Sequence, residues 1–213
     1  MIEFLKNISI RRIWWLKLLW NKKRTYLYQS GWIKSFKLKK PVDQNGNPIP
    51  WLSLPIVDFL GERLKSDMDV FEYGAGNSTL YFAPKVNSVD SVEHEAAWVN
   101  ILKPSLPSNA TIFHESLDNG KAYAEKSTTT GKKYDIILID GRDRVACCKA
   151  CLQARKSNGI ILYDDSQRDR YQEGVRLLMQ QGCKRLDFWG MGSAGIHKKC
   201  TTLFYFDDNC LGI

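Results

Sequence analysis

The stretch Val70–Leu80 (VFEYGAGNSTL) carries the residues best suited to chemistry. An apolar run includes Glu72, and Gly74 and Gly76 then form a tight turn that leads into a helix. Glycines permit positive φ angles and let a ligand approach the backbone closely. Thr79 stands where a dinucleotide fingerprint has its third glycine, and no G-K-S/T sequence of a phosphate loop follows. A carboxylate beside a bare turn favours a cationic or amino-bearing ligand.

Three further acids, Asp140, Asp164 and Asp165, follow two apolar runs that are expected to be neighbouring strands. Open α/β sheets bind their ligands at the carboxyl ends of such strands. Three carboxylates converging there could hold Mg²⁺, which prefers oxygen ligands and would lower the pKa of a substrate hydroxyl. Without a metal, one of them could act as a general base, or all three could accept hydrogen bonds from loop amides. The sequence leaves these alternatives open.

The elements that must position these residues begin after Trp51, where apolar runs alternate with helical stretches. The segments between the first five runs are long enough for crossover helices, which favours parallel strands covered on both faces. The last two runs have no helix between them and are expected to pair antiparallel. The predicted fold is α/β, a doubly wound Rossmann-like sheet of seven mostly parallel strands with an antiparallel C-terminal hairpin. The expected strands are Asp69–Tyr73, Val86–Glu93, Ala110–His114, Tyr134–Asp140, Gly159–Tyr163, Lys184–Trp189 and Thr201–Phe206.

The composition is that of a folded protein, with 44% hydrophobic and 25% charged residues among 213. No apolar run approaches the roughly 20 residues that span a bilayer, so an integral membrane protein is not expected. The net charge of +8 arises from eleven Lys or Arg within residues 1–40, whereas residues 41–213 hold 20 basic and 22 acidic residues, a net of −2. Nucleic acid is therefore not an expected partner. Six cysteines without a cleavable signal pattern predict reduced thiols and a cytoplasmic location.

Residues 1–50 are interpreted as a basic helical N-terminal extension with a connector, and residues 51–213 as the main domain. Within the extension, Ile2–Leu27 alternates apolar and basic residues, and Pro41–Pro50 has the prolines and the Asn-Gly pair of a turn-rich connector. A basic helix with Trp and Leu could make peripheral contact with an anionic membrane through residues 1–27, at its inner face. The alternative is a helix packed on its own domain or on a second subunit of a homo-oligomer.

The segment EYGAGNST (72–79) resembles the first motif of the class I S-adenosylmethionine-dependent methyltransferases, an acid followed by G-x-G at the end of the first strand. Later segments resemble further elements of that family in the same order: SVEH (91–94), YDIILIDG (134–141) and GIILYDDS (159–166). The resemblance covers residues 51–213 and implies S-adenosylmethionine as the cofactor, with Glu93 at the ribose hydroxyls. The cofactor-binding residues that it implies are Glu72, Tyr73, Gly74, Gly76, Asn77, Ser78, Thr79, Glu93, His94, Glu115, Ser116 and Asp140.

The expected reaction is methyl transfer from S-adenosylmethionine to a small or medium acceptor. Asp140, Asp164 and Asp165 are the expected catalytic residues and favour an oxygen nucleophile; the catechol-type O-methyltransferases have Mg²⁺ ligands at similar positions. Residues 30–51 and LYDDSQRDRY (162–171) also resemble bacterial methyltransferases linked to surface glycan synthesis, which implies a sugar or glycolipid acceptor. Two other classes stay open: a nucleotide- or NAD-binding oxidoreductase, and a non-catalytic, membrane-associated scaffold of the same fold.

Overall fold

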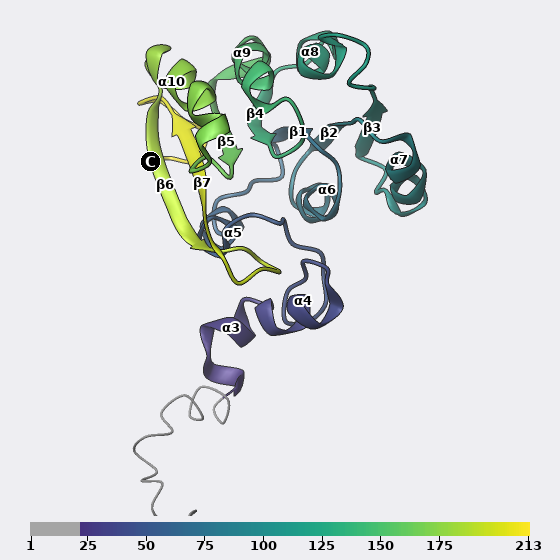
Figure 1. Ribbon diagram of the computed structural model, residues 1–213, viewed down its shortest axis with the longest axis vertical. Helices are drawn as coiled ribbons and strands as arrows, with labels where there is room; N and C mark the ends of the chain where they lie inside the picture. Colours follow the sequence, from purple (N-terminus) through teal and green to yellow (C-terminus); the bar gives the residue numbers. More distant parts are fainter. Residues whose placement is uncertain (1–21) are drawn as a thin grey trace, which may run out of the picture.

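A seven-stranded sheet organises residues 22–213, the part of the chain that the computed structural model describes (Figure 1). Its strand order is β3-β2-β1-β4-β5-β7-β6. The first five strands run parallel, and β7 is antiparallel to both β5 and β6. This confirms the predicted doubly wound, Rossmann-like sheet with its antiparallel C-terminal hairpin. The strands are β1 (Asp69–Tyr73), β2 (Ser88–Glu93), β3 (Ala110–His114), β4 (Tyr134–Ile139), β5 (Arg155–Asp164), β6 (Lys184–Met191) and β7 (Lys198–Tyr205).

Two strands begin earlier than their apolar runs predict. Strand β5 begins at Arg155 instead of Gly159, because Arg155 already pairs with Tyr134 of β4 before a shift in register. Strand β7 begins at Lys198 instead of Thr201, and its first residues pair with the end of β6. Both strands begin with polar residues, so the apolar pattern in the sequence starts later than the strand itself. Backbone pairing does not depend on an apolar side chain.

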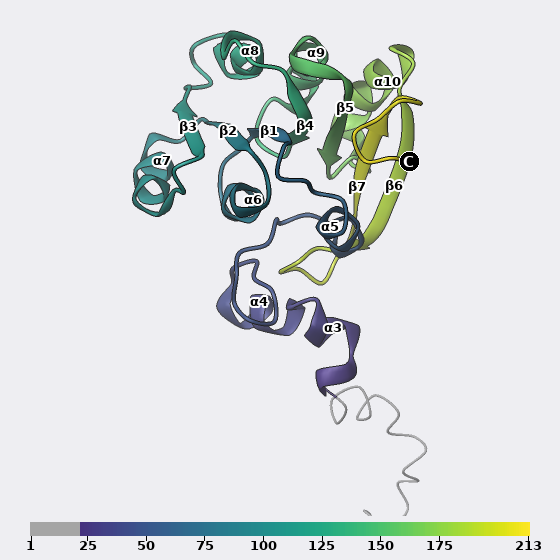
Figure 2. The ribbon, with the colours of Figure 1, turned by 180° about the vertical axis from the view of Figure 1, so that it is seen from behind.

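Helices cover both faces of the sheet (Figures 1 and 2). Helices α8, α9 and α10 lie on one face, and α5, α6 and α7 lie on the other. Short 3₁₀ turns continue α6 and α7 and precede α10. These elements are α5 (Leu54–Gly61), α6 (Asn77–Phe82), η3 (Ala83–Lys85), α7 (Ala96–Leu102), η4 (Lys103–Ser105), α8 (Ala122–Thr129), α9 (Arg144–Ala154), η5 (Asp169–Tyr171) and α10 (Gln172–Gln180).

Successive side chains of a central strand enter different cores, as the pleat of a strand requires. Val70 of β1 packs with residues of α5 and α6, whereas Phe71 and Tyr73 pack with residues of α8, α9 and α10. Every residue of β4 is buried, because this strand lies between β1 and β5 and is covered on both faces. The same alternation directs Glu72 toward α6, on the Val70 side of the sheet.

Residues 22–50 lie against the sheet domain through η2 (Lys22–Arg24), α3 (Tyr26–Gln29) and α4 (Trp32–Leu38). The indole Nε1 of Trp32 donates to the carbonyl of Gly195 at 2.7 Å. The side-chain amide of Asn77 donates to the carbonyl of Pro41 at 2.5 Å. The first bond holds α4 against the loop between β6 and β7, and the second holds the segment after α4 beside the turn that follows β1.

The predicted basic helix of Ile2–Leu27 lies mostly outside the described residues. Contact of this helix with an anionic membrane therefore stays a prediction. Two further expectations, a homo-oligomer and a division of the chain at residue 50, also stay predictions. Within residues 22–213, no helix is both long and apolar enough to cross a bilayer.

Candidate functional site

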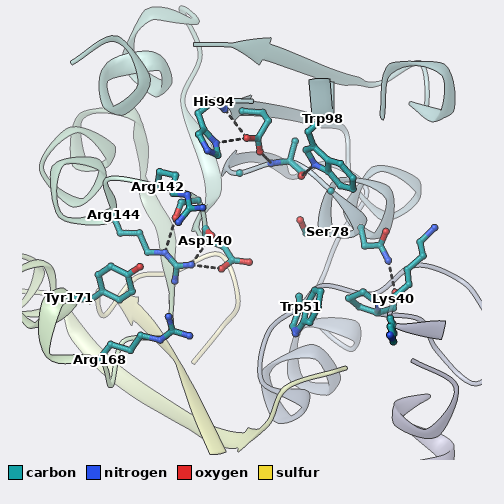
Figure 3. A pocket seen from close by; sticks show the side chains of 18 of the residues that line it. Lys40, Trp51, Ser78, His94, Trp98, Asp140, Arg142, Arg144, Arg168 and Tyr171 are labelled. Atoms are coloured by element: carbon teal, nitrogen blue, oxygen red, sulfur yellow. Dashed lines mark hydrogen bonds and ion pairs between the residues drawn. The ribbon is translucent and has the colours of Figure 1, made fainter. Parts of the chain in front are cut away.

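A cavity of about 650 Å³ opens at the carboxyl ends of β1, β2 and β4 (Figure 3). Parallel α/β sheets bind ligands at this edge, where the loops from several strands meet. The turns after β1 and β2 line one side of the cavity, and the segments after β4 and β5 line another. Residues between α4 and α5, among them Lys40 and Trp51, complete the lining.

The turn after β1 leaves bare backbone facing this cavity. Gly74 has a φ of 94°, and a Cβ at this position would lie 3.0 Å from the Cα of Gly141. A Cβ at Gly76 would meet no atom within 4 Å, although Gly76 lines the cavity. Glycine at position 74 thus allows a close approach of two turns, and position 76 leaves open space that a ligand can occupy.

Glu72 lies behind this turn and is fully buried. Its Oε2 accepts hydrogen bonds from Thr79 Oγ1 at 2.6 Å and from Ser91 Oγ at 2.9 Å. Thr79 Oγ1 in turn accepts the backbone N–H of Gly76 at 3.1 Å. Burial raises the pKa of Glu72 to about 7, against an opposing effect of hydrogen bonds from Thr79, Ser78 and Ser91. Glu72 therefore braces the turn from inside and is not among the residues that line the cavity.

Glu93 ends β2 and lines the cavity, and protein groups already surround its carboxylate. Its Oε2 accepts the N–H of Ala75 at 3.2 Å, and its Oε1 accepts the N–H groups of His94 at 2.8 Å and Glu95 at 3.1 Å. The Nδ1 of His94 lies 2.5 Å from Oε1 as well. A carboxylate offers about four acceptor positions. A ligand hydroxyl at Glu93 would therefore exchange with one of these partners, and the half-buried His94 ring is the only side chain among them.

Asp140 follows β4 and faces the cavity, with 26% of its side chain exposed. Arg144 Nη2 donates to its Oδ1 at 2.9 Å, and the same nitrogen donates to its backbone carbonyl at 2.8 Å. Burial and the neighbouring Asp164 carboxylate raise the pKa of Asp140 well above its usual range, although Arg144 and Lys199 oppose the shift. Asp140 thus combines access to the cavity with a raised proton affinity.

Asp164 and Asp165 lie behind Asp140, and cations hold both. Lys199 Nζ donates to Asp164 Oδ2 at 2.7 Å, and Thr201 Oγ1 donates to its Oδ1 at 2.6 Å. Asp165 pairs with Arg168 at 2.7 Å. Neither acid lines the cavity.

The expectation of Mg²⁺ at the three acids is not supported. Among residues 22–213 there is no group of three or more His, Cys, Asp or Glu side chains arranged to hold a metal ion. Arg144 approaches Asp140, Asp164 and Asp165, so a protein cation already occupies the position that a metal would need. The donor set does not fit a divalent ion, and no step of the reaction is assigned to one.

The structure brings half of the sequence-predicted site residues together at the cavity. The others lie elsewhere: the hydroxyl of Tyr73 donates to the carbonyl of Ala124 at 2.7 Å on the opposite face of the sheet, and Glu115 pairs with Lys126 at 2.5 Å. The roles of all these residues stay predictions. Those that line the cavity are Gly74, Gly76, Asn77, Ser78, Glu93, His94 and Asp140, and those that do not are Glu72, Tyr73, Thr79, Glu115, Ser116, Asp164 and Asp165.

Sequence reasoning missed the arginines of the cavity. The triplet Arg-Asp-Arg occurs twice, at 142–144 directly after β4 and its Asp140-Gly141 turn, and at 168–170 after β5. All four arginines line the cavity. The repeated triplet at the ends of adjacent strands was the signal that could have found them. Two tryptophans of the lining, Trp51 and Trp98, had no such signal, because their positions depend on how distant segments pack.

No protein-family profile matches the sequence, and a search of curated proteins gives no match. Solved structures do share the fold. Precorrin-6y C5,15-methyltransferase of Geobacter metallireducens is 15% identical, with a TM-score of 0.55 over 72% of this chain and 88% of that one. An O-methyltransferase of Bacillus cereus in complex with SAH is also 15% identical, with a TM-score of 0.56 over 70% of this chain and 78% of that one.

Spermidine synthase of Thermotoga maritima is similar as well, at 13% identity and a TM-score of 0.52 over 72% of this chain and 60% of that one. At such identities the likeness establishes the fold alone. The chain has the Rossmann-like α/β fold of methyltransferases. Because a spermidine synthase shares this fold, the reaction has to be argued from the cavity itself.

Proposed function

We propose that this chain transfers a methyl group from S-adenosylmethionine to a small or medium acceptor. The observation that carries the proposal is the shared cavity, which the bare Gly74–Gly76 turn, Glu93 and Asp140 all face. Its volume of about 650 Å³ lies within the roughly 300–1,000 Å³ of small-molecule sites. When bound, S-adenosylmethionine supplies an electrophilic methyl group on a sulfonium sulfur.

In this proposal some residues of the cavity bind S-adenosylmethionine and others contact the methyl acceptor. Gly76, Asn77 and Ser78 border the part of the cavity next to the turn, where open space adjoins bare backbone. Glu93 and His94 would bind the ribose hydroxyls. The rigid turn orients the cofactor, and alignment of the reacting atoms contributes much of such a rate enhancement.

Asp140 is the proposed general base of the reaction. It accepts the proton that an acceptor hydroxyl loses as its oxygen bonds to the methyl carbon; the carbon–sulfur bond breaks at the same time, and its electron pair stays on the sulfur of the departing S-adenosylhomocysteine. The raised pKa of Asp140 suits this role, because a carboxylate with a higher proton affinity is a stronger base. An oxygen nucleophile follows from this assignment, and a sugar or glycolipid is the proposed acceptor, supported by the resemblance of residues 30–51 and 162–171 to glycan-linked methyltransferases.

Calorimetric titration with S-adenosylmethionine, S-adenosylhomocysteine and NAD tests the proposal against its rivals. We expect both adenosyl compounds to bind and NAD not to bind. Preferential binding of NAD would instead favour the oxidoreductase. Binding of the adenosyl compounds without methyl transfer from labelled S-adenosylmethionine to any component of native cell extract would favour the non-catalytic scaffold.

A further inference from the structure

Basic side chains dominate the lining of the cavity. Six of its residues are Lys or Arg, whereas Glu93 and Asp140 are the only acids among them. The four arginines belong to residues 41–213, which as a whole carry a net charge of −2, and the two lysines belong to the basic segment of residues 1–40. The cations are therefore concentrated at the cavity, and a cleft lined by one sign of charge raises the local concentration of ligands of the opposite sign. They are Lys39, Lys40, Arg142, Arg144, Arg168 and Arg170.

Two of these cations already form ion pairs with carboxylates of the protein. Arg144 bonds to Asp140, and Arg168 bonds to Asp165. Lys39, Lys40, Arg142 and Arg170 make no ion pair within residues 22–213; the guanidinium of Arg170 lies over the ring of Tyr171. Four positive charges at the cavity are thus left for a ligand.

The cofactor of the proposed reaction does not account for these charges. S-adenosylmethionine carries one carboxylate against an ammonium and a sulfonium group, so its net charge is positive. An excess of cations would disfavour it unless the second ligand is an anion. We infer that the acceptor carries a phosphate or diphosphate group that Arg142, Arg170, Lys39 and Lys40 bind, an inference that rests on the proposed methyl transfer.

The arrangement of the cations fits a multiply charged group between two walls. Arg142 belongs to one wall, and Lys40 lies across the cavity from it, next to Trp51 (Figure 3). The planar guanidinium of arginine offers paired donors that match phosphate oxygens, and lysine adds a mobile point charge. Trp51 is half exposed beside Lys40 and provides an apolar surface for the uncharged part of an acceptor.

Backbone strain occurs at the same place. Three non-glycine residues within residues 22–213 have a φ in the left-handed region, namely Lys39 at 51°, Asp143 at 44° and Asp165 at 54°. Lys39 lines the cavity, Asp143 separates Arg142 from Arg144, and Asp165 holds Arg168. Such strain costs energy and is concentrated at functional sites, where it orients side chains for a ligand. Here it lies beside the cations and not beside the turn after β1.

The test uses the full chain saturated with S-adenosylhomocysteine and titrated with inorganic pyrophosphate. We expect binding that weakens as salt increases, because the cations are exposed and salt screens them. The double variant R142Q/R170Q should bind pyrophosphate roughly tenfold more weakly or worse, since it loses two charged hydrogen-bond donors. Arg176→Gln is the matched control, because Arg176 is exposed on α10 and does not line the cavity.

The affinity for S-adenosylhomocysteine is measured in every variant. It distinguishes failure of the proposed methyl transfer from failure of the inferred anionic acceptor. An unchanged value in R142Q/R170Q shows that the variant is folded and that the cations belong to the acceptor side. Equal pyrophosphate affinity in the parent and the double variant, or no binding to the parent complex, would overturn the anionic acceptor and leave methyl transfer standing. A parent chain that fails to bind S-adenosylhomocysteine would overturn the proposed function and the acceptor with it.

A second arm distinguishes the source of the phosphate. The same chains are sedimented with vesicles of phosphatidylglycerol. Pelleting of the parent but not of R142Q/R170Q would assign the phosphate to a lipid-linked acceptor. Equal pelleting of both, together with the loss of pyrophosphate affinity, would assign it to a soluble phosphorylated acceptor.

Discussion

Two carboxylate centres lie at the carboxyl ends of neighbouring strands, the first at β1 and the second at β4 and β5, and their negative charges are compensated in different ways. The turn centre consists of Glu72 with the hydroxyls of Thr79 and Ser91, and no cation pairs with it within residues 22–213. The cavity centre consists of Asp140, Asp164 and Asp165 with Arg144 and Lys199 among them. Both centres are largely buried, yet only the second has an acid that reaches the cavity.

The difference shows what each kind of partner does for a buried acid. Hydroxyl groups donate to Oε2 of Glu72 but supply no charge, and its Oε1 has no hydrogen-bond partner within residues 22–213. Desolvation therefore dominates, and the pKa of Glu72 rises to about 7. Cations in the cavity centre supply charge, so three acids can lie close together in one place. The first arrangement suits a brace for a turn, and the second suits a site at which a proton is gained and lost.

The largest effect is expected from Asp140→Asn. An amide cannot accept the proton of the acceptor, so kcat should fall by about 10²–10⁴, far more than cofactor affinity. In the parent, kcat should rise with pH above the ordinary carboxylate range, because the raised pKa of Asp140 delays its ionisation. Methyl-transfer rates against pH give the measurement, with Asp67→Asn as the control, because Asp67 is exposed and does not line the cavity. If Asp140→Asn keeps the parent rate, the cavity centre is structural.

Arg144→Met should have the next largest effect, on stability. It removes a buried cation from between three carboxylates and leaves Lys199 and the more exposed Arg168 to compensate them. Breaking a buried ion pair costs about 3–5 kcal/mol. Urea unfolding at pH 7 measures the loss, which should shrink at low pH as the carboxylates become protonated. The exposed Arg176→Met is the control, and a loss no larger than in this control would mean that charge pairing does not hold the cavity centre.

Glu72→Gln should change the pH dependence of stability. The folded-state pKa of about 7 lies above the ordinary 4.5, so the contribution of Glu72 to stability is complete below pH 4.5 and is lost as pH rises through 7. At about 1.4 kcal/mol per pKa unit, this loss reaches up to about 3 kcal/mol. Glutamine keeps acceptors for Thr79 and Ser91 but does not ionise.

Free energies of unfolding between pH 4.5 and 8 test this expectation for the turn centre. The curve of Glu72→Gln should be flatter than that of the parent. Parallel curves would show that Glu72 titrates as an exposed acid does. Weaker binding of S-adenosylmethionine in this variant, at unchanged stability, would instead support the sequence-based role of Glu72 in binding the cofactor.

Glu93→Ala should weaken binding of S-adenosylmethionine by about 1.5–3 kcal/mol, the range for hydrogen bonds to a charged group. The variant loses the acceptor for ribose hydroxyls and releases the N–H of Ala75 in the turn after β1. Calorimetry provides the measurement. The exposed neighbour Glu95→Ala is the matched control, and equal affinities of the two variants would remove Glu93 from the site.

The sequence by itself determined the sheet and the glycine turn after its first strand. Apolar runs such as 69–73 and 134–139 are buried on both faces, and burial on both faces requires the near-continuous hydrophobic pattern that the sequence displays. The G-x-G turn could likewise be placed, because a positive φ and a close approach of backbones restrict the choice to glycine at position 74.

Only the tertiary structure decided which acid faces the cavity. Glu72 and Asp140 both end a strand in the sequence, but α6 and β2 enclose Glu72, whereas Asp140 stays at the open edge. Lys199 compensates Asp164 from 35 residues away in the chain, across an antiparallel pair whose start is polar. Such contacts depend on how separate segments pack. A local pattern of residue types cannot predict which residues far apart in the sequence will touch.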